Sequence, residues 1–172
     1  ELTTSQITGI LDQLVDAGSL FLTFTGGEIF LRRDFAEIYT YARQRGLLVK
    51  LFTNGTTLTP KIADLLAEWR PHMVEITLYG ATQETYEQVT QVPGSYTRCM
   101  QCIELLMERK IPLELKSVLL TTNRHELDEM RNFADRLGVR YRYDGMLWPR
   151  LDGSCKPFGY QLPIEELISL DL

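Results

Sequence analysis

Two glycines and an acid at the end of an apolar run are the residues of this sequence whose types most clearly point to chemistry. Gly26, Gly27 and Glu28 follow a run that ends at Thr25. Adjacent glycines allow positive φ and leave no Cβ between a ligand and the main-chain amides and carbonyls. Glu28 adds carboxylate oxygens, which together with main-chain carbonyls would hold a primary ammonium. The segment predicts a site for an amino acid or a ligand built from one; the alternative is a tight strand-to-helix connection with a surface acid.

Three further polar residues lie in or directly after other apolar runs. They are Asn54, Thr77 and Lys116, and ligands of parallel α/β folds bind beyond the carboxyl ends of the strands. Asn54 is followed by glycine, so an ordinary turn explains it equally well. Lys116 lies within an apolar segment, and its ammonium must reach a solvated cavity or an anion, such as a ligand carboxylate, unless it snorkels or forms an internal ion pair.

The three cysteines do not form a recognisable metal site. Cys99 and Cys102 lie on the apolar stripe of a helix, with no second pair or nearby histidine, so core packing is the better interpretation. Cys155 lies alone in a segment rich in glycine and proline. Three cysteines in a chain of this size also favour reduced thiols over a disulfide framework.

The elements that would position these residues alternate along the chain, which predicts parallel strands joined by crossover helices. The expected strands are Leu20–Thr25, Leu47–Thr53, Met73–Leu78, Leu113–Leu120 and Val139–Leu147. The expected helices are Thr4–Ala17, Asp34–Arg45, Pro60–Trp69, Tyr96–Lys110 and His125–Leu137. Asp34 and Thr59 fit N-caps, and Gly18, Gly46 and Gly138 fit helix ends. Nearly continuous apolar strands favour a sheet covered by helices, either an open barrel or a doubly wound sheet.

Composition excludes several other classes of protein. The chain has 172 residues, 44% of them hydrophobic, which is enough for one sizeable core. A net charge of −5 with scattered basic residues argues against a nucleic-acid partner. No long apolar segment or secretory signal is present, so we expect a cytoplasmic protein without membrane attachment. A phosphate site at the glycines is not expected, because Glu28 would repel it and no dinucleotide or Walker motif occurs.

Taken together, the ordered motifs resemble the radical S-adenosylmethionine (radical SAM) enzymes. "FTGGEIFLRRDF" resembles the Gly-Gly-Glu-Pro segment of that family, with Ile29 in place of the usual proline. "LFTNGTTL", "VEITLYGATQETYEQVTQVPGSY" and "LELKSVLLTTN" follow in the order and at the spacings of the family. The similarity extends from Leu20 to Pro149, and the exit "PRLDGS" is most similar to the SPASM-type subgroup, which modifies peptides or builds cofactors from them.

The resemblance implies a partial (β/α)6 TIM-like barrel of parallel strands that binds S-adenosylmethionine. Gly26, Gly27 and Glu28 would hold the methionyl ammonium. Thr77 and Lys116 would bind the methionyl carboxylate, and Asn54 would help to line the pocket. The intact enzyme would cleave S-adenosylmethionine reductively at a [4Fe-4S] cluster and use a 5′-deoxyadenosyl radical on a peptide or cofactor-precursor substrate.

One departure concerns the cluster, which the family binds through a Cys-x3-Cys-x2-Cys loop after the first barrel strand. This sequence lacks that loop, and its three cysteines have neither the spacing nor the position. We therefore expect the first strand to be missing, no cluster in this chain and no reductive cleavage by it alone. We interpret residues 1–150 as the truncated core barrel, and residues 151–172 as an irregular exit and the start of a helix leading to an absent C-terminal extension.

A missing first strand would leave the hydrogen-bonding edge of Leu20–Thr25 open, and exposed edges recruit partners. We therefore expect self-association through that edge. Two other functions stay open: a Schiff-base lyase on a different α/β barrel, with Lys116 as the amine, and a non-catalytic module that binds a ligand or partner.

Overall fold

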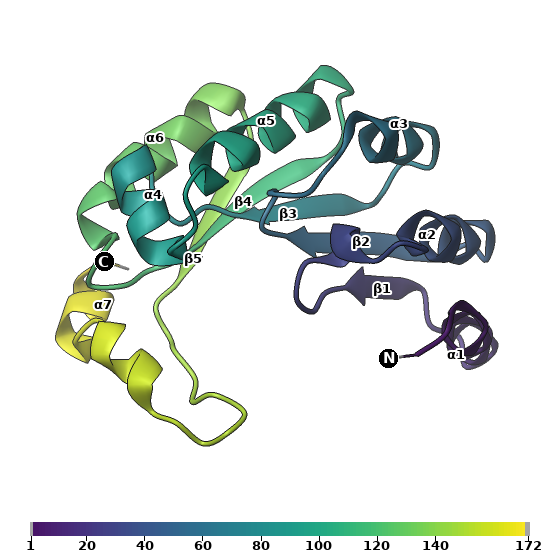
Figure 1. Ribbon diagram of the computed structural model, residues 1–172, viewed down its shortest axis with the longest axis horizontal. Coiled ribbons are helices and arrows are strands. Elements are labelled where there is room, and N and C mark those ends of the chain that lie inside the picture. The colour runs from purple at the N-terminus through teal and green to yellow at the C-terminus, as the bar shows by residue number, and fades with distance from the viewer. Residues whose placement is uncertain (1, 171–172) are drawn as a thin grey trace. The chain divides into compact units, whose positions relative to one another are not determined.

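The computed structural model describes residues 2–170, and its strands form one parallel sheet in the order β1-β2-β3-β4-β5 (Figure 1). The strands are β1 (Phe21–Phe24), β2 (Leu48–Thr53), β3 (Met73–Thr77), β4 (Leu113–Val118) and β5 (Arg140–Asp144). The α-helices are α1 (Thr4–Asp16), α2 (Phe35–Gln44), α3 (Pro60–Glu68), α4 (Gln83–Thr90), α5 (Ser95–Glu108), α6 (Leu127–Leu137) and α7 (Ile164–Leu170). The predicted α/β class with a parallel sheet is confirmed.

The local signals at helix ends were informative to different degrees. Thr59 caps α3 by accepting a hydrogen bond from the Ile62 amide, and Pro60 begins the helix, as predicted. Gly138 ends α6 in the left-handed conformation. Asp34 lies at the N-cap position of α2, but its side chain makes no capping bond. The expected elements are thus present, and α4 is an additional helix that the pattern of apolar residues did not predict.

Within the described residues the chain divides into two compact units. Unit 1 comprises the residues up to Ile76 together with Arg98–Glu114, and unit 2 comprises Thr77–Thr97 together with the residues from Leu115 onward. Each unit has its own core and its own polar network.

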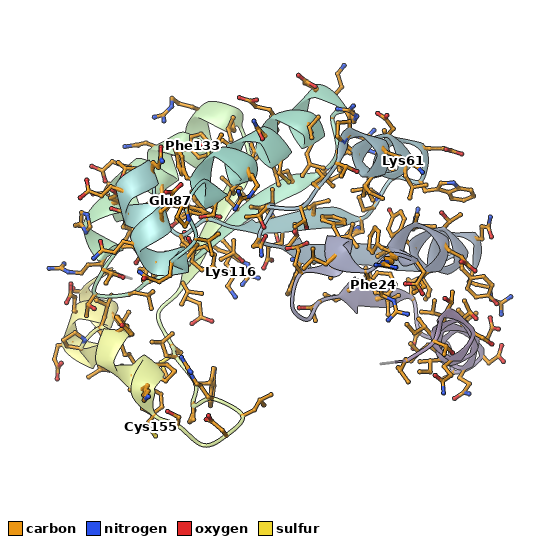
Figure 2. All side chains as sticks on the ribbon, in the orientation of Figure 1. Phe24, Lys61, Glu87, Lys116, Phe133 and Cys155 are labelled. Carbon is orange, nitrogen blue, oxygen red and sulfur yellow. The ribbon has the colours of Figure 1, made fainter. Side chains whose placement is uncertain are left out.

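The core of unit 1 forms where α2 packs against β1 and β2. β1 pairs in register with β2, so that Phe24 lies beside Leu51, which is fully buried. Phe24, labelled in Figure 2, makes an edge contact with Phe35 of α2 at 6.4 Å between ring centroids. Phe35 stacks in turn on Tyr39. This aromatic contact fixes the end of β1, and therefore the start of the diglycine loop, against α2.

The other face of the unit 1 sheet carries a charged cluster that sequence reasoning did not identify. Lys50 of β2 forms ion pairs with Glu75 of β3, at 2.9 Å, and with Glu114 of β4. The two glutamates are only 3% and 5% exposed. Burial by itself lowers the pKa of Lys50, but its hydrogen bonds and charge pairing with the two carboxylates outweigh burial and raise it. One lysine therefore neutralises buried carboxylates from two neighbouring strands.

Replacing Lys50 by methionine should destabilise the chain, because two buried carboxylates would lose their cation. We expect a loss of about 2–3 kcal/mol in the free energy of unfolding, below the ~3–5 kcal/mol typical of fully buried pairs, since Lys50 is partly exposed. The change in the free energy of unfolding is measured by urea denaturation. Lys61→Met, on the exposed side of α3, is the matched control and should change stability by less than about 0.5 kcal/mol. Equal stability of the two variants would contradict the assignment.

Unit 2 packs α6 against β4 and β5. The Ser117 hydroxyl of β4 donates to the Leu78 carbonyl at 2.6 Å and contacts the Met130 sulfur of α6. The Tyr141 hydroxyl of β5 reaches the same sulfur. The chain leaves β5 at Gly145, where a Cβ would lie 2.2 Å from a Leu167 methyl carbon. A side chain at position 145 would therefore displace the end of the Leu167 side chain, where α7 packs against the end of β5.

Candidate functional site

The diglycine loop leaves its main chain open to a ligand. Gly26 and Gly27 are exposed, and Gly26 has φ +142°, a conformation that other residues rarely adopt. A Cβ built on either glycine would meet nothing within 4 Å. The glycines are therefore not required by packing inside the loop, which agrees with a loop kept bare for the close approach of something else.

Glu28 connects this loop to the end of the neighbouring strand. Its carboxylate accepts from the Thr53 hydroxyl at 2.8 and 2.9 Å and from the Asn54 amide at 3.0 Å. It also accepts from the Phe30 amide at 3.2 Å, which caps the short 3₁₀ helix η1 (Ile29–Leu31). The structure thus brings the glycine–glycine–glutamate segment and the Thr-Asn-Gly turn into direct contact within unit 1.

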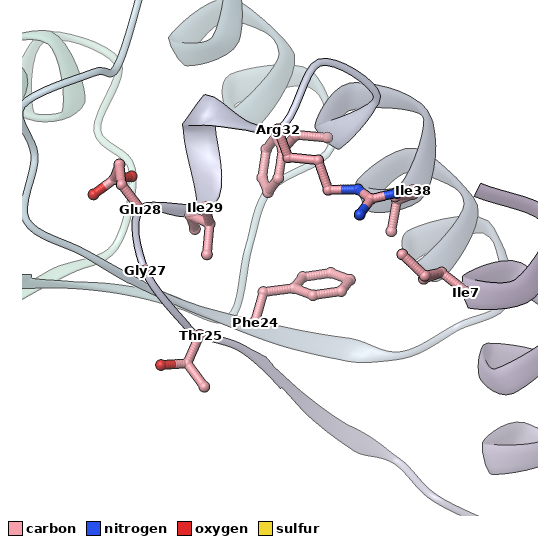
Figure 3. Close-up of a pocket in the computed structure, with 9 residues that line it drawn as sticks. Ile7, Phe24, Thr25, Gly27, Glu28, Ile29, Arg32 and Ile38 are labelled. Atoms are coloured by element: carbon pink, nitrogen blue, oxygen red, sulfur yellow. The ribbon is translucent and has the colours of Figure 1, made fainter. Parts of the chain in front are cut away.

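Glu28 is among the residues that line an apolar hollow beside the loop, and Figure 3 shows its carboxylate turned away from Phe24 and Ile29. That hollow has a volume of about 260 Å³ and is lined mainly by aliphatic and aromatic side chains of α1, β1, η1 and α2. Figure 3 shows Phe24 and Ile29 on the hollow side of the loop. The carboxylate consequently lies on the polar side of the loop, at the end of β2, and the apolar side anchors the loop to the helices.

The side chain of Asn54 stabilises a turn. Its Oδ1 accepts from the Thr56 amide at 2.8 Å and from the Thr56 hydroxyl at 2.6 Å. The following Gly55 has φ +73°, and a Cβ there would lie 3.3 Å from both Cβ and Sγ of Cys102. Asn54 contacts Glu28 through its main-chain amide. This hydrogen bond depends on where the turn places the main chain and not on the asparagine side chain.

Cys99 and Cys102 pack beneath this turn, as their helical stripe predicts. Both are almost fully buried, and burial, followed by the proximity of Cys99 and Glu28, raises the pKa of the Cys102 thiol. A [4Fe-4S] cluster is held by several cysteine thiolates, and two thiols packed in the core do not provide that set of ligands. Cys155 lies in unit 2 and is exposed. Among the described residues no group of three His, Cys, Asp or Glu side chains could hold a metal ion.

Thr77 and Lys116 lie together in unit 2. Thr77 ends β3, and the amide of the next residue, Leu78, donates to the Lys116 carbonyl at 2.7 Å. Both side chains are half-buried, and Lys116, labelled in Figure 2, makes no ion pair with any described residue. The six predicted site residues are therefore brought together in two groups, one around Glu28 and Asn54 in unit 1 and one in unit 2.

Two contributors near the glycine loop were missed by sequence reasoning. Thr53 was treated as the last residue of a strand, although its hydroxyl bridges Glu28 and the Gly55 amide. Arg32 pairs with Asp34 through two contacts of 2.7 and 2.8 Å. Hydrogen bonds from Arg32 and Thr4 hold the pKa of the Asp34 carboxyl below its usual range. That pairing explains why Asp34 does not cap α2.

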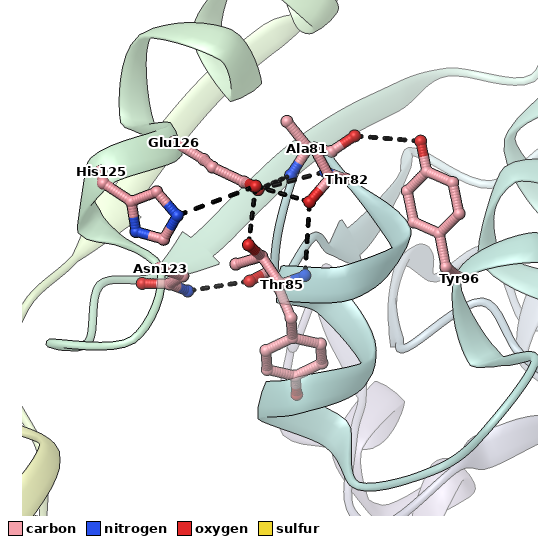
Figure 4. A network of polar contacts seen from close by, with 8 residues as sticks. Ala81, Thr82, Thr85, Tyr96, Asn123, His125 and Glu126 are labelled. Carbon is pink, nitrogen blue, oxygen red and sulfur yellow. Dashed lines mark hydrogen bonds and ion pairs between the residues drawn. The ribbon is translucent and has the colours of Figure 1, made fainter.

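The segment that follows β3 in unit 2 is held by Glu126, which is 6% exposed (Figure 4). Its carboxylate accepts from the amides of Ala81, at 2.6 Å, and Thr82, at 3.1 Å, and from the hydroxyls of Thr82 and Thr85, both at 2.6 Å. Burial raises the pKa of Glu126, but these hydrogen bonds outweigh burial and leave it below the ordinary value. A buried carboxylate thus fixes the start of α4.

This pairing predicts acid-sensitive stability. The pKa of Glu126 is lower in the folded state, so its contribution is present above the unfolded pKa of about 4.3 and is lost as pH falls through the folded value. At pH 7 Glu126→Gln should lower the free energy of unfolding by roughly 1–3 kcal/mol. The gap from wild type should shrink below about pH 4.

The matched control is Glu129→Gln, on the exposed face of α6. The free energy of unfolding of Glu129→Gln, measured by denaturant titration, should equal that of the wild type at pH 7 and at pH 3. A Glu126→Gln defect that is unchanged at pH 3 would contradict an ionised carboxylate at this position.

Comparison with known proteins decides the family. Residues 1–136 match the model of the radical SAM superfamily. The chain belongs to the radical SAM superfamily. Among curated radical SAM relatives, it is 34% identical over 140 residues to PqqA peptide cyclase of Rhizobium meliloti, covering 81% of this chain and 37% of that protein. It is 32% identical over 139 residues to AdoMet-dependent heme synthase of Methanosarcina barkeri, covering 81% and 40%.

Solved structures show the same fold. SuiB of Streptococcus suis superposes with a TM-score of 0.84 at 15% identity, covering 99% of this chain and 39% of that chain. The enzyme anSMEcpe with bound AdoMet and Cp18Cys peptide superposes with a TM-score of 0.75 at 16% identity, covering 95% and 50%. The fold is therefore that of the partial TIM barrels of the radical SAM family.

The chain spans about two-fifths of the length of these curated relatives. The family assignment argues against a lyase built on a different α/β barrel. No helix among the described residues is long and apolar enough to cross a membrane.

Proposed function

We propose that the chain is the core of a radical SAM enzyme that reductively cleaves S-adenosylmethionine to modify a peptide or build a cofactor. The observation that carries this proposal is the contact between the diglycine loop and the Thr-Asn-Gly turn through Glu28. It creates a fixed carboxylate beside bare main chain, at the place where the family motif lies. Cofactor and cluster together supply the one-electron chemistry, and the protein binds and orients the cofactor.

The residues present fit the amino end of the cofactor. A primary ammonium has three donors and no acceptor. Glu28 offers a charged acceptor, and the carbonyls of the exposed residues Gly26 and Gly27 offer neutral ones without a side chain in the way. We assign the methionyl ammonium to these three residues, with Asn54 supporting Glu28 through its amide.

For the methionyl carboxylate we propose Thr77 and Lys116. Lys116 is a half-buried lysine without an ion pair among the described residues, on a strand next to Thr77. A carboxylate would satisfy both the ammonium of Lys116 and the hydroxyl of Thr77.

The cluster ligands are not provided by this chain, because its cysteines do not fit them. We propose that they lie in a part of the protein outside the 172 residues. We also propose that residues 1–150 form the core barrel without its first strand, and that residues 151–172 lead into a further extension.

The substrate class follows from the relatives, which include a PqqA peptide cyclase and a mycofactocin maturase. We infer a peptide or cofactor precursor as substrate and the cytoplasm as the location. The net charge of −5 supports the absence of a nucleic-acid partner.

Glu28→Gln should weaken use of the cofactor in the anaerobically purified, cluster-containing protein. Loss of one charge-assisted hydrogen bond, worth roughly 1.5–3 kcal/mol, lowers kcat/KM for 5′-deoxyadenosine formation by about 10- to 100-fold. Product formed with dithionite is measured by mass spectrometry.

The cluster absorbance should not change in that variant. Glu37→Gln, on the exposed side of α2, is the control and should retain full activity. If Glu28→Gln matches the control, the ammonium assignment is wrong.

We further propose that two copies of this chain associate through β1. Within the described residues β1 is an edge strand of the sheet; Leu20, directly before it, and Phe21, its first residue, are 54% and 65% exposed. An open apolar edge is a template for strand pairing. Light scattering at rising concentration should show a dimer that Phe21→Lys abolishes; a constant monomer mass would exclude it.

A further inference from the structure

We propose that Thr53 is a specificity-determining residue: it limits Glu28 to a single additional donor and so selects a primary ammonium over a guanidinium. This inference rests on the proposed function, which assigns a ligand ammonium to Glu28, and it adds a residue and a basis for selectivity.

A carboxylate has two oxygens and about four acceptor positions. Within the described residues three donors already use Glu28: the Phe30 amide on Oε1, the Asn54 amide on Oε2, and the Thr53 hydroxyl. Of the roughly four acceptor positions of the Glu28 carboxylate, about one is therefore left for a ligand. A ligand that needs two carboxylate oxygens at once would have to displace one of these donors.

Thr53 occupies the position that matters most for a forked ligand. Its Oγ1 lies 2.8 Å from Oε1 and 2.9 Å from Oε2 of Glu28, so the hydroxyl sits between the two oxygens. A guanidinium binds a carboxylate through two parallel N–H donors, one to each oxygen. The Thr53 hydroxyl therefore blocks the forked mode, and a single N–H of an ammonium can still reach the remaining position.

The direction of the Thr53 hydroxyl is fixed by the turn. The Gly55 amide donates to Thr53 Oγ1 at 2.9 Å. Because the amide occupies one side of Oγ1, the hydroxyl proton of Thr53 points to the other side, where the Glu28 carboxylate lies. Thr53 is 4% exposed, so water does not compete for this proton. The block is thus a built feature of the strand end rather than a mobile surface contact.

The test compares two small cations on the 172-residue chain. The ¹⁵N-labelled chain is titrated with methylammonium or methylguanidinium chloride at constant ionic strength, and the amide shifts of Gly27, Glu28 and Gly55 are followed by NMR. In wild type we expect methylammonium to bind at least threefold more tightly. In Thr53→Val the ratio of the two dissociation constants should shift toward methylguanidinium by fivefold or more.

Thr53→Ser keeps the hydroxyl and should keep the wild-type ratio. Thr53→Ala is a second hydroxyl-free variant, for use if valine disturbs folding. Thr23→Val, on exposed β1, is the matched control for a strand threonine that does not touch Glu28. A merely structural role of Thr53 would change stability without changing the ratio.

Three outcomes would overturn the proposal: an unchanged ratio in both hydroxyl-free variants, tighter methylguanidinium binding in wild type, or no saturable shift from either cation. The separate Glu28→Gln measurement on the cluster-containing protein tests the proposed function. Normal cofactor use in Glu28→Gln together with the expected ratios would remove the cofactor assignment and keep the selectivity. The converse result would remove only the role of Thr53.

Discussion

The contact on which the rest of the site depends is the one between Glu28 and the end of β2. Two neighbouring parallel strands end side by side, and each is followed by a glycine-containing segment that has no regular hydrogen bonds of its own. A single carboxylate satisfies the Asn54 amide and the Thr53 hydroxyl and caps η1 at the same time. Without it, the Thr53 hydroxyl and the Asn54 amide at the end of β2 and the Phe30 amide of η1 would lose this acceptor, and each such donor left unsatisfied in a buried position costs about 1–3 kcal/mol.

Two other charged side chains likewise bind several buried polar groups at once. Lys50 serves two buried glutamates of unit 1, and Glu126 serves two amides and two hydroxyls of unit 2. In each case one charged group joins segments far apart in sequence. Such clusters add little net stability compared with apolar packing, but removing one member is costly. They therefore fix register and loop position more than they hold the fold together.

Sequence reasoning succeeded where the cause was local. Most of the strands were predicted because their apolar runs are nearly continuous, and Thr59 and Pro60 were assigned correctly because capping depends on neighbouring residues. It failed where the cause was distant. α4 is short and largely polar, and its first turn is held by Glu126, more than 40 residues away. Asp34 was expected to cap α2, but Arg32 and Thr4 compete for its carboxylate. The bridging role of Thr53 depends on a partner 25 residues earlier in the chain.

In the proposed site the two glycines contact the ligand, and the residues around them hold the loop in place. A loop that must bind a ligand through its main chain needs glycine, yet glycine makes the loop flexible and raises the entropy lost on binding. A side chain at Gly26 or Gly27 would find no neighbour within 4 Å of its Cβ. The conformation of the two glycines is held in place by their neighbours in the chain. Phe24 and Ile29 make apolar contacts on one side of the loop, and Glu28 forms hydrogen bonds to the Thr-Asn-Gly turn on the other. Preorganisation of this kind lets a bare main chain bind without bearing the full cost of its own ordering. The diglycine loop and the Thr-Asn-Gly turn are therefore best regarded as one structural unit.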